Sequence, residues 1–380
     1  MPTINPVLSA LPEYPIERLN AAERALRAAG RRVFDFGTGD PLEPTPAFIR
    51  QALERGVPAS CRYPPVRGTP AFRAAAADYL RRRFAVTLDP ETQVLPTLGS
   101  KEAIFLLPFA FLDPRSGRDV VAFPLPGYPV YEAGTRFAGG TPHGVPLTPG
   151  NRFLIEPWTL PAEVRRRLAI LWINYPHNPS GALAPAEYLA RVARFAAEED
   201  VLVCSDECYA DMYVDELPRS LLEHGTKNVL AFHSCSKRSG MTGYRSGFVA
   251  GDAALVKTFQ KLRPNVGTAP QAFVEQAAIA AWKDDAHAAE RRAVFAAKRR
   301  VFEAFFPRRG LELCGGTGGF FLWFRAPGQD DVGYAERLLA AGIIVMPGSW
   351  LGPGGEGFCR LALVPDLETC RAATEAWPAV

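Results

Sequence analysis

Three apolar runs in this chain each lead directly into polar residues, and this arrangement constrains its fold more than any other feature. The runs cover residues 169–173, 201–204 and 229–233, and each is typical of a buried β-strand. The second run leads into Asp206. Ligands of open α/β sheets bind beyond the carboxyl ends of the strands, and a buried carboxylate is costly unless a cation accompanies it. We therefore expect a ligand site at these strand ends, with Asp206 facing a cation. A structural capping role is the alternative for this carboxylate.

The third run leads into a segment rich in serine and lysine. It reads Ser234-Cys235-Ser236-Lys237, and Arg245 follows eight residues after the lysine. Serine hydroxyls and a guanidinium bind a dianion such as phosphate, and a lysine beside them can form a Schiff base with an aldehyde. The cofactor that combines an aldehyde with a phosphate is pyridoxal 5'-phosphate (PLP). A loop with one exposed lysine is the simpler alternative, but it does not explain the whole segment.

This segment resembles the lysine signature of the class I and II aminotransferases, which are PLP enzymes of fold type I. The residues that match are those of the pattern Ser-x-Ser-Lys followed by Gly-x-Arg-x-Gly. The resemblance implies that Lys237 carries the cofactor as a Schiff base and acts as general base and acid. It also implies that Ser234, Ser236 and Arg245 hold the cofactor phosphate. Burial beside cations should lower the pKa of Lys237 below its usual value.

A second motif follows the first apolar run. Residues 174–181 read Asn-Tyr-Pro-His-Asn-Pro-Ser-Gly, which is similar to the family's Asn-x-Pro-x-Asn-Pro-Ser/Thr-Gly. The resemblance implies that Asn178 binds the phenolic oxygen of the cofactor and helps to bind the substrate. Tyr209 would share that oxygen, and Asp206 would keep the pyridine nitrogen protonated, so that the ring accepts electrons.

Two further segments imply cofactor contacts. Ser100 and Lys101 stand at a helix start, where free backbone N–H groups suit a phosphate, and the family places phosphate contacts there. The alternative is a plain N-cap serine. The family also has an aromatic residue that stacks on the cofactor ring, and Tyr128 is the candidate. Tyr131 could take this place instead, or both could be core residues.

The same resemblance assigns the substrate carboxylate and a subunit contact. Gly39, in a short glycine turn, and Arg360, on a strand near the carboxyl end, would bind the substrate carboxylate, Arg360 through two parallel hydrogen bonds. Tyr63 would reach the active site of a partner subunit and touch the cofactor phosphate, which implies a homodimer. An ordinary turn and a proline-stiffened connector are the alternatives for the segments of Gly39 and Tyr63.

Composition and spacing exclude several other classes. The net charge of 380 residues is only +3, which gives no electrostatic case for nucleic-acid binding. Seven cysteines without a Cys-x-x-Cys pair indicate free thiols, and the five histidines lack metal-ligand spacing. We expect a cytoplasmic protein without a membrane segment, because no signal peptide is visible and the longest apolar run is too short to span a bilayer. Residues 352–357 fit Gly-x-Gly-x-x-Gly but precede an expected strand, so they do not predict a dinucleotide site.

The resemblance extends over about residues 30–370 and implies an α/β fold. We expect a large PLP-binding domain at residues 46–280, built on a mostly parallel seven-stranded sheet. Residues 281–380 should form a smaller α+β domain. Residues 1–45 should supply an N-terminal arm and part of this smaller domain.

The implied activity is transfer of an amino group from an amino acid to 2-oxoglutarate. Three segments (residues 39–46, 92–96 and 360–364) look like the succinyldiaminopimelate transaminases of lysine biosynthesis, so N-succinyl-LL-diaminopimelate is the first substrate we consider. Aminotransferases for aspartate, for aromatic amino acids or for LL-diaminopimelate are alternatives. A PLP-dependent C–S β-lyase would share every motif. A regulatory PLP-binding domain would need an N-terminal DNA-binding domain, for which the residues before position 34 leave no room.

Overall fold

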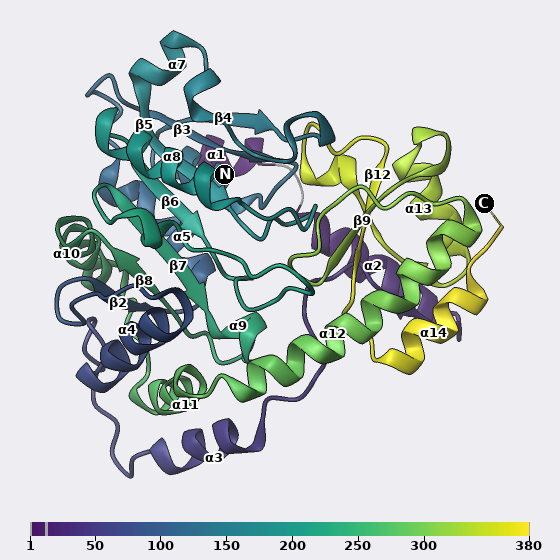
Figure 1. The fold of residues 1–380 in the computed structure, drawn as a ribbon, viewed down its shortest axis with the longest axis horizontal. Coiled ribbons are helices and arrows are strands. Elements are labelled where there is room, and N and C mark those ends of the chain that lie inside the picture. Colours follow the sequence, from purple (N-terminus) through teal and green to yellow (C-terminus); the bar gives the residue numbers. More distant parts are fainter. Residues whose placement is uncertain (1, 12–13, 380) are drawn as a thin grey trace.

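The structure is a computed structural model that describes residues 2–11 and 14–379. Its largest element is a seven-stranded sheet with strand order β2-β8-β7-β6-β5-β3-β4, in which β8 runs opposite to its neighbours (Figure 1). The predicted mostly parallel seven-stranded sheet is confirmed. The strands are β2 (Val94–Thr97), β3 (Val120–Leu125), β4 (Thr141–Pro146), β5 (Leu168–Asn174), β6 (Leu202–Asp206), β7 (Val229–Ser234) and β8 (Gly247–Gly251).

Helices cover both faces of this sheet. Side chains of a strand point alternately to the two faces. Ile170 and Trp172 of β5 pack with α5 (Ser100–Phe111), α6 (Val130–Phe137) and α10 (Ala253–Leu262). Leu171 and Ile173 point the other way and belong to the cluster that includes α3 (Ala47–Gly56), α4 (Pro70–Phe84), α8 (Ala186–Glu198) and α11 (Ala272–Lys283). Burial on both faces explains why the central strands are almost uniformly apolar in sequence.

A second, smaller β layer lies beside the large sheet. Strands β9 (Phe321–Arg325), β11 (Met346–Pro347) and β12 (Phe358–Ala362) form an antiparallel sheet in the order β11-β12-β9. Strand β1 (Phe34–Asp35) pairs in parallel with β10 (Ile343–Ile344), so the amino-terminal segment joins the carboxyl-terminal part of the chain. The core of this layer includes residues of α12 (Ala286–Phe305), α13 (Asp331–Ala340) and α14 (Leu367–Ala376). The residue boundaries of the two expected domains stay a prediction.

Local capping sets some helix starts but not others. The Thr69 hydroxyl accepts a hydrogen bond from the Phe72 amide (3.2 Å) and starts α4 as the Thr-Pro pair predicts. The pair Thr45-Pro46 also predicts a cap, but this prediction is wrong, because the Thr45 hydroxyl donates to the carbonyl of Gly240 and α3 begins without a side-chain cap. A tertiary contact therefore replaces the local cap and ties residue 45 to the loop that follows Lys237.

The remaining helices are short or lie near the amino terminus. They are α1 (Pro6–Ala10), α2 (Pro15–Ala28), α7 (Ala162–Arg167) and α9 (Cys235–Arg238). The Asn5 side chain accepts a hydrogen bond from the Val7 amide (2.9 Å) and starts α1. Within residues 2–11 and 14–379, no helix is both long and apolar enough to cross a membrane.

Candidate active site

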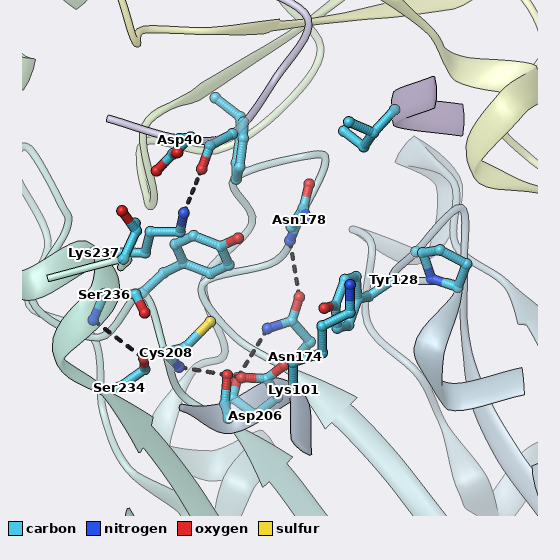
Figure 2. A pocket seen from close by; sticks show the side chains of 18 of the residues that line it. Asp40, Lys101, Tyr128, Asn174, Asn178, Asp206, Cys208, Ser234, Ser236 and Lys237 are labelled. Carbon is cyan, nitrogen blue, oxygen red and sulfur yellow. Dashed lines mark hydrogen bonds between the residues drawn. The ribbon is translucent and has the colours of Figure 1, made fainter. Parts of the chain in front are cut away.

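Strands β5, β6 and β7 end at a cavity of about 490 Å³ (Figure 2). Asn174, Asp206 and Ser234, the last residues of these strands, all line it. Every predicted site residue except Tyr63 also lines this cavity, namely Gly39, Ser100, Lys101, Tyr128, Asn178, Asp206, Tyr209, Ser234, Ser236, Lys237, Arg245 and Arg360. The large sheet, the amino-terminal segment and β12 of the small sheet therefore meet at one site.

Lys237 lies in the one-turn helix α9, directly after β7. Its ammonium group donates a hydrogen bond to the carbonyl of Gly39. Burial is the main cause that lowers the pKa of Lys237 to about 8, while the charge of Asp40 acts in the opposite direction. Arg245 and Arg360 lower it further. The expected depression of this pKa is therefore present, and an appreciable fraction of the amine is neutral near neutral pH.

Asp206 is almost completely buried at the carboxyl end of β6. One carboxylate oxygen accepts a hydrogen bond from the Tyr131 hydroxyl (2.8 Å), and the other accepts one from the Cys208 amide (3.3 Å). Burial raises the pKa of Asp206 above its usual value, and these donors partly oppose the rise. No salt bridge joins Asp206 to a cationic side chain in the described part of the chain. Within residues 2–11 and 14–379, the cation expected opposite this carboxylate is therefore not a side chain that forms an ion pair with it.

Tyr128 and Tyr131 have different places. Tyr128 lines the cavity, whereas Tyr131 lies behind the wall with its ring almost fully buried. The Tyr131 ring stacks on Trp172, with ring centres 5.1 Å apart and planes 23° apart. Of the two aromatic candidates for the cavity wall, only Tyr128 can contact a ligand there.

A dianion could bind where the loop after Lys237 meets the start of α5. Gly99 precedes this helix with a φ of 75°, and a side chain there would come within 2.6 Å of the Arg245 guanidinium. Arg245 donates to the carbonyls of Thr242 (2.7 Å) and Leu98 (3.2 Å). The Ser234 hydroxyl accepts a hydrogen bond from the Ser236 amide (3.2 Å). Serine hydroxyls, a guanidinium and a helix start thus line the same cavity.

The ammonium group of Lys101 lies next to two tyrosine rings. Its ammonium nitrogen is 4.8 Å from the centre of the Tyr14 ring and 3.4 Å from the Tyr14 hydroxyl. It is also 6.0 Å from the centre of the Tyr128 ring. The contacts of Lys101 are therefore aromatic, and its predicted place beside the cofactor phosphate stays a prediction.

Arg360 closes the cavity from the small sheet. Its guanidinium donates to the Asn178 side-chain oxygen (3.0 Å) and to the carbonyl of Gly37 (2.6 Å). The Nε atom is buried without a hydrogen-bond partner among the described residues. Burial lowers the pKa of Arg360 to about 10, so the group stays charged at neutral pH. A buried cation with an unused donor suits a carboxylate ligand.

Several cavity residues were not predicted. Cys208 lies between Lys237 and Asp206 in Figure 2. The side-chain nitrogen of Asn174 donates to the Asp206 carbonyl (2.8 Å), and its side-chain oxygen accepts from the Asn178 amide (3.0 Å). Asn174 opens the motif at residues 174–181, and Cys208 lies between Asp206 and Tyr209, so these positions could have indicated both residues. Tyr14 comes from the segment before α2 and carries no comparable signal. Tyr63 is fully exposed and outside the cavity, which leaves its predicted contact with a partner subunit untested.

Comparisons with known proteins cover nearly the whole chain. The family described as "Aminotransferase class I and II" matches residues 31–376. The chain is 41% identical over 361 residues to an LL-diaminopimelate aminotransferase of Desulforudis audaxviator, which covers 93% of this chain and 91% of that protein. It also superposes on an aminotransferase from Neisseria meningitidis with a TM-score of 0.91, at 32% identity over 98% of each chain. A single mutant of Thermus thermophilus aspartate aminotransferase gives a TM-score of 0.90 at 28% identity over 99% of each chain.

Proposed function

This chain belongs to the class I and II aminotransferase family, and from that premise we propose that it transfers an amino group between LL-diaminopimelate and 2-oxoglutarate. Enzymes of this family use PLP, and the chain is a PLP-dependent transaminase. The observation that carries the choice of substrate is its 41% identity to an LL-diaminopimelate aminotransferase. N-succinyl-LL-diaminopimelate, the first substrate considered from the sequence, becomes the alternative.

The residues of the cavity fit PLP. Asp206 is a buried carboxylate without an ion-pair partner in the described part of the chain, which suits a protonated pyridine nitrogen. Because Gly99 has no side chain, the Arg245 guanidinium can lie close to the backbone at the start of α5. A guanidinium beside the N–H groups of a helix start suits a phosphate. The amine of Lys237 lies in the same cavity as both groups. We propose that Ser100, Ser234, Ser236 and Arg245 hold the phosphate, with Lys101 near it.

Lys237 would perform the proton transfers. When bound, PLP supplies an aldehyde that captures amines and a ring that accepts electrons from the substrate Cα. A general base works best when its pKa is near the working pH, and the pKa of about 8 meets that requirement. We propose that the Lys237 Nζ removes a proton from the Cα of the amino donor and delivers a proton to the Cα of the new amino acid in the reverse half-reaction.

The other residues would bind and orient. Arg360 and the backbone of Gly39 would hold the α-carboxylate, which fixes the direction of the Cα–H bond toward Lys237. Asn178 would contact both the cofactor and the substrate, because its side-chain oxygen accepts from Arg360 (3.0 Å), the residue proposed to bind the substrate carboxylate. Tyr209 would donate to the phenolic oxygen, and Tyr128 would cover one face of the ring.

We also propose that the enzyme is a homodimer. Tyr63 is fully exposed and lies in the segment between α3 and α4. An aromatic side chain with no cover in one chain would gain burial and a hydroxyl contact at a partner's phosphate site. Sedimentation analysis should give twice the monomer mass, and Tyr63→Phe should weaken PLP binding without changing that mass. A monomer with full activity would contradict both expectations.

Half-reactions with single amino donors test the substrate. Mixing the PLP-loaded enzyme with LL-diaminopimelate should convert the cofactor to its amine form, seen as loss of visible absorbance, and 2-oxoglutarate should restore it. N-succinyl-LL-diaminopimelate carries an uncharged acyl amide in place of the distal ammonium, so it should react at least about tenfold more slowly. Faster conversion by the succinylated compound, by aspartate or by an aromatic amino acid would contradict the proposal.

A C–S β-lyase is separated by its products. With a cysteine conjugate, a lyase releases pyruvate, ammonia and a thiol, whereas a transaminase forms a 2-oxo acid that keeps the sulfur. We expect no pyruvate from such a conjugate under conditions in which LL-diaminopimelate reacts fully. Sustained pyruvate release would favour the lyase.

A further inference from the structure

Tyr131 joins two parts of the site although it does not line the cavity. Its hydroxyl donates to Asp206 Oδ2 (2.8 Å), and both side chains are almost fully buried. Its ring meets the ring of Tyr128 edge to face, with ring centres 5.8 Å apart and an angle of 84°. Tyr128 forms the cavity wall and Asp206 forms its floor. One residue therefore contacts both of these surfaces from behind.

The Tyr131 ring has little freedom to move. Trp172 stacks on it at 5.1 Å, and Phe123 lies 6.4 Å away at an angle of 40°. Trp172 is fully buried in β5, and Tyr131 itself stands in the first turn of α6. Because packed aromatic rings resist displacement, the hydroxyl remains directed at the carboxylate. The bond from Tyr131 is also the shorter of the two that reach the Asp206 oxygens.

We propose that Tyr131 is a positioning residue for the transamination: its hydroxyl holds Asp206 as the anion that faces the ring nitrogen of PLP, and its ring fixes the Tyr128 wall relative to that anion. This inference rests on the PLP-dependent activity but not on which amino acid is the donor. A hydrogen bond to the anion favours the form in which the shared proton stays on the nitrogen and the carboxylate stays charged.

The surroundings of Asp206 offer few other groups that could do this. On the elements packed around it, the titratable side chains are Tyr128 and Tyr131 of the segment before and within α6, Cys208 and Tyr209 after β6, His233 of β7, and Lys237 of α9. His233 pairs with Glu207 (3.3 Å), and Lys237 donates to Gly39. The Cys208 thiol, whose pKa burial raises, is a weak donor. Tyr131 therefore supplies the strong side-chain hydrogen bond to the anion.

Tyr131→Phe tests the proposal, because it keeps the ring and removes only the hydroxyl. The variant is loaded with PLP labelled with ¹⁵N in its ring, and the nitrogen signal is recorded by NMR across pH. The signal should shift toward that of an unprotonated pyridine, and the dissociation constant of PLP should rise by about tenfold, the usual worth of a hydrogen bond to a charged group. A nitrogen signal identical to that of the wild type would overturn the proposal.

Tyr79→Phe is the matched control. Tyr79 is also almost fully buried, and its hydroxyl donates to a buried carboxylate, Asp211 (2.9 Å), that does not line the cavity. The control should lose a comparable amount of stability and leave the nitrogen signal of bound PLP unchanged. Equal nitrogen shifts in the two variants would mean that Tyr131 acts only through general packing, and would overturn the proposal.

A double variant keeps the proposal testable if Tyr131→Phe does not fold. Loss of the hydroxyl leaves Asp206 with one donor fewer, so the single variant can fail because of the uncompensated charge. Asp206→Asn removes that charge, and Tyr131→Phe combined with Asp206→Asn should then fold as well as Asp206→Asn alone. Failure of the double variant to fold would mean that the Tyr131 hydroxyl supports folding by a route other than the Asp206 charge, and would overturn the proposal.

Discussion

Two buried pairs of tyrosine and aspartate, whose carboxylates are five residues apart in the sequence, differ in their charged partners. Tyr131 donates to Asp206, and Tyr79 donates to Asp211, at 2.8 and 2.9 Å. Asp211 also accepts from Arg83 (2.9 Å) and Arg238 (2.7 Å). Although burial alone would raise the pKa of Asp211, the two arginines outweigh it and hold the pKa at about 2. Among the described residues no arginine or lysine forms an ion pair with Asp206, and burial raises its pKa.

The difference shows how a buried charge in a fold can be distinguished as structural or functional. Asp211 is neutralised within the chain and ties α4 to the α9 loop through its two arginines. Asp206 lines the cavity and has no ion-pair partner among the described residues, so its charge is available to a ligand. A buried charge without an ionic partner lowers the stability of the folded protein. Such charges are found mainly at binding and catalytic sites, where they serve function.

Replacement of the cavity carboxylate should give the largest effect and tests the functional half of this comparison. We expect Asp206→Asn to lower kcat/KM by about 10²–10³, as does removal of a group that stabilises charge in a transition state. The PLP-free variant should be at least as stable as the wild type, because an uncompensated carboxylate is removed. Steady-state kinetics and urea unfolding measure the two quantities. Full turnover by Asp206→Asn would show that Asp206 has no more functional role than Asp211.

Replacement of Asp211 should have the opposite result, a large loss of stability and a small loss of activity. We expect Asp211→Asn to lower the free energy of unfolding by about 3–5 kcal/mol, because Arg83 and Arg238 lose a buried partner. The kcat per folded molecule should change much less than in Asp206→Asn. The matched control is Asp78→Asn, whose partners Arg81 and Arg82 are at the surface, and it should cost less than about 1 kcal/mol. Equal losses in the two variants would contradict the structural role.

Acid should affect the two pairs in opposite directions. The pKa of Asp211 is lowered in the fold, so its contribution to stability is present above the unfolded pKa and is lost as the pH falls toward about 2. That contribution is about 2 kcal/mol. The pKa of Asp206 is raised, so its ionised form costs stability at neutral pH and this cost disappears in acid.

Unfolding curves between pH 7 and pH 3 measure this difference on PLP-free protein. Relative to Asp211→Asn, the wild type should lose its advantage as the pH falls. Relative to Asp206→Asn, the wild type should gain. Parallel changes in the two comparisons would show that both carboxylates have the same environment.

The smallest effect is expected for the control tyrosine. Tyr79→Phe should lower the free energy of unfolding by about 1 kcal/mol, because Asp211 keeps its two arginines when the hydroxyl is removed. The kcat should stay close to that of the wild type. Thermal unfolding and steady-state kinetics on the same preparation measure the stability and the kcat of this variant. A large loss of kcat would mean that Asp211 and its two arginines also act on Lys237.

Much of the fold could be predicted from the sequence, because its central strands are buried on both faces. The runs at 169–173, 201–204 and 229–233 became β5, β6 and β7 with shifts of a few residues. The edge strands were not identified individually. Strand β4 contains Pro142, Gly144 and Pro146, and β2 contains Pro96, which remove the usual strand signals. Such residues are tolerated at sheet edges, where tertiary pairing rather than local propensity decides the conformation.

The site could be predicted where its residues lie in compact motifs. Lys237, Asn178 and Asp206 each stand at or just beyond the end of a strand, and the structure brings them into one cavity. Tyr14 and the position of Tyr131 behind the wall could not be predicted. Tyr131 and Asp206 are 75 residues apart, and only the packing of α6 on the sheet brings the hydroxyl to the carboxylate.

The amino-acid sequence alone determined which chemical groups stand at the ends of the central strands, because burial, strand pattern and motif spacing are all local properties. It did not determine which of two carboxylates, five residues apart, would have a cation within the chain. That was decided when the fold brought Arg83 and Arg238 to Asp211 and brought the Tyr131 hydroxyl and the Cys208 amide to Asp206. The partners come from distant segments, and a charge acts through space rather than along the chain.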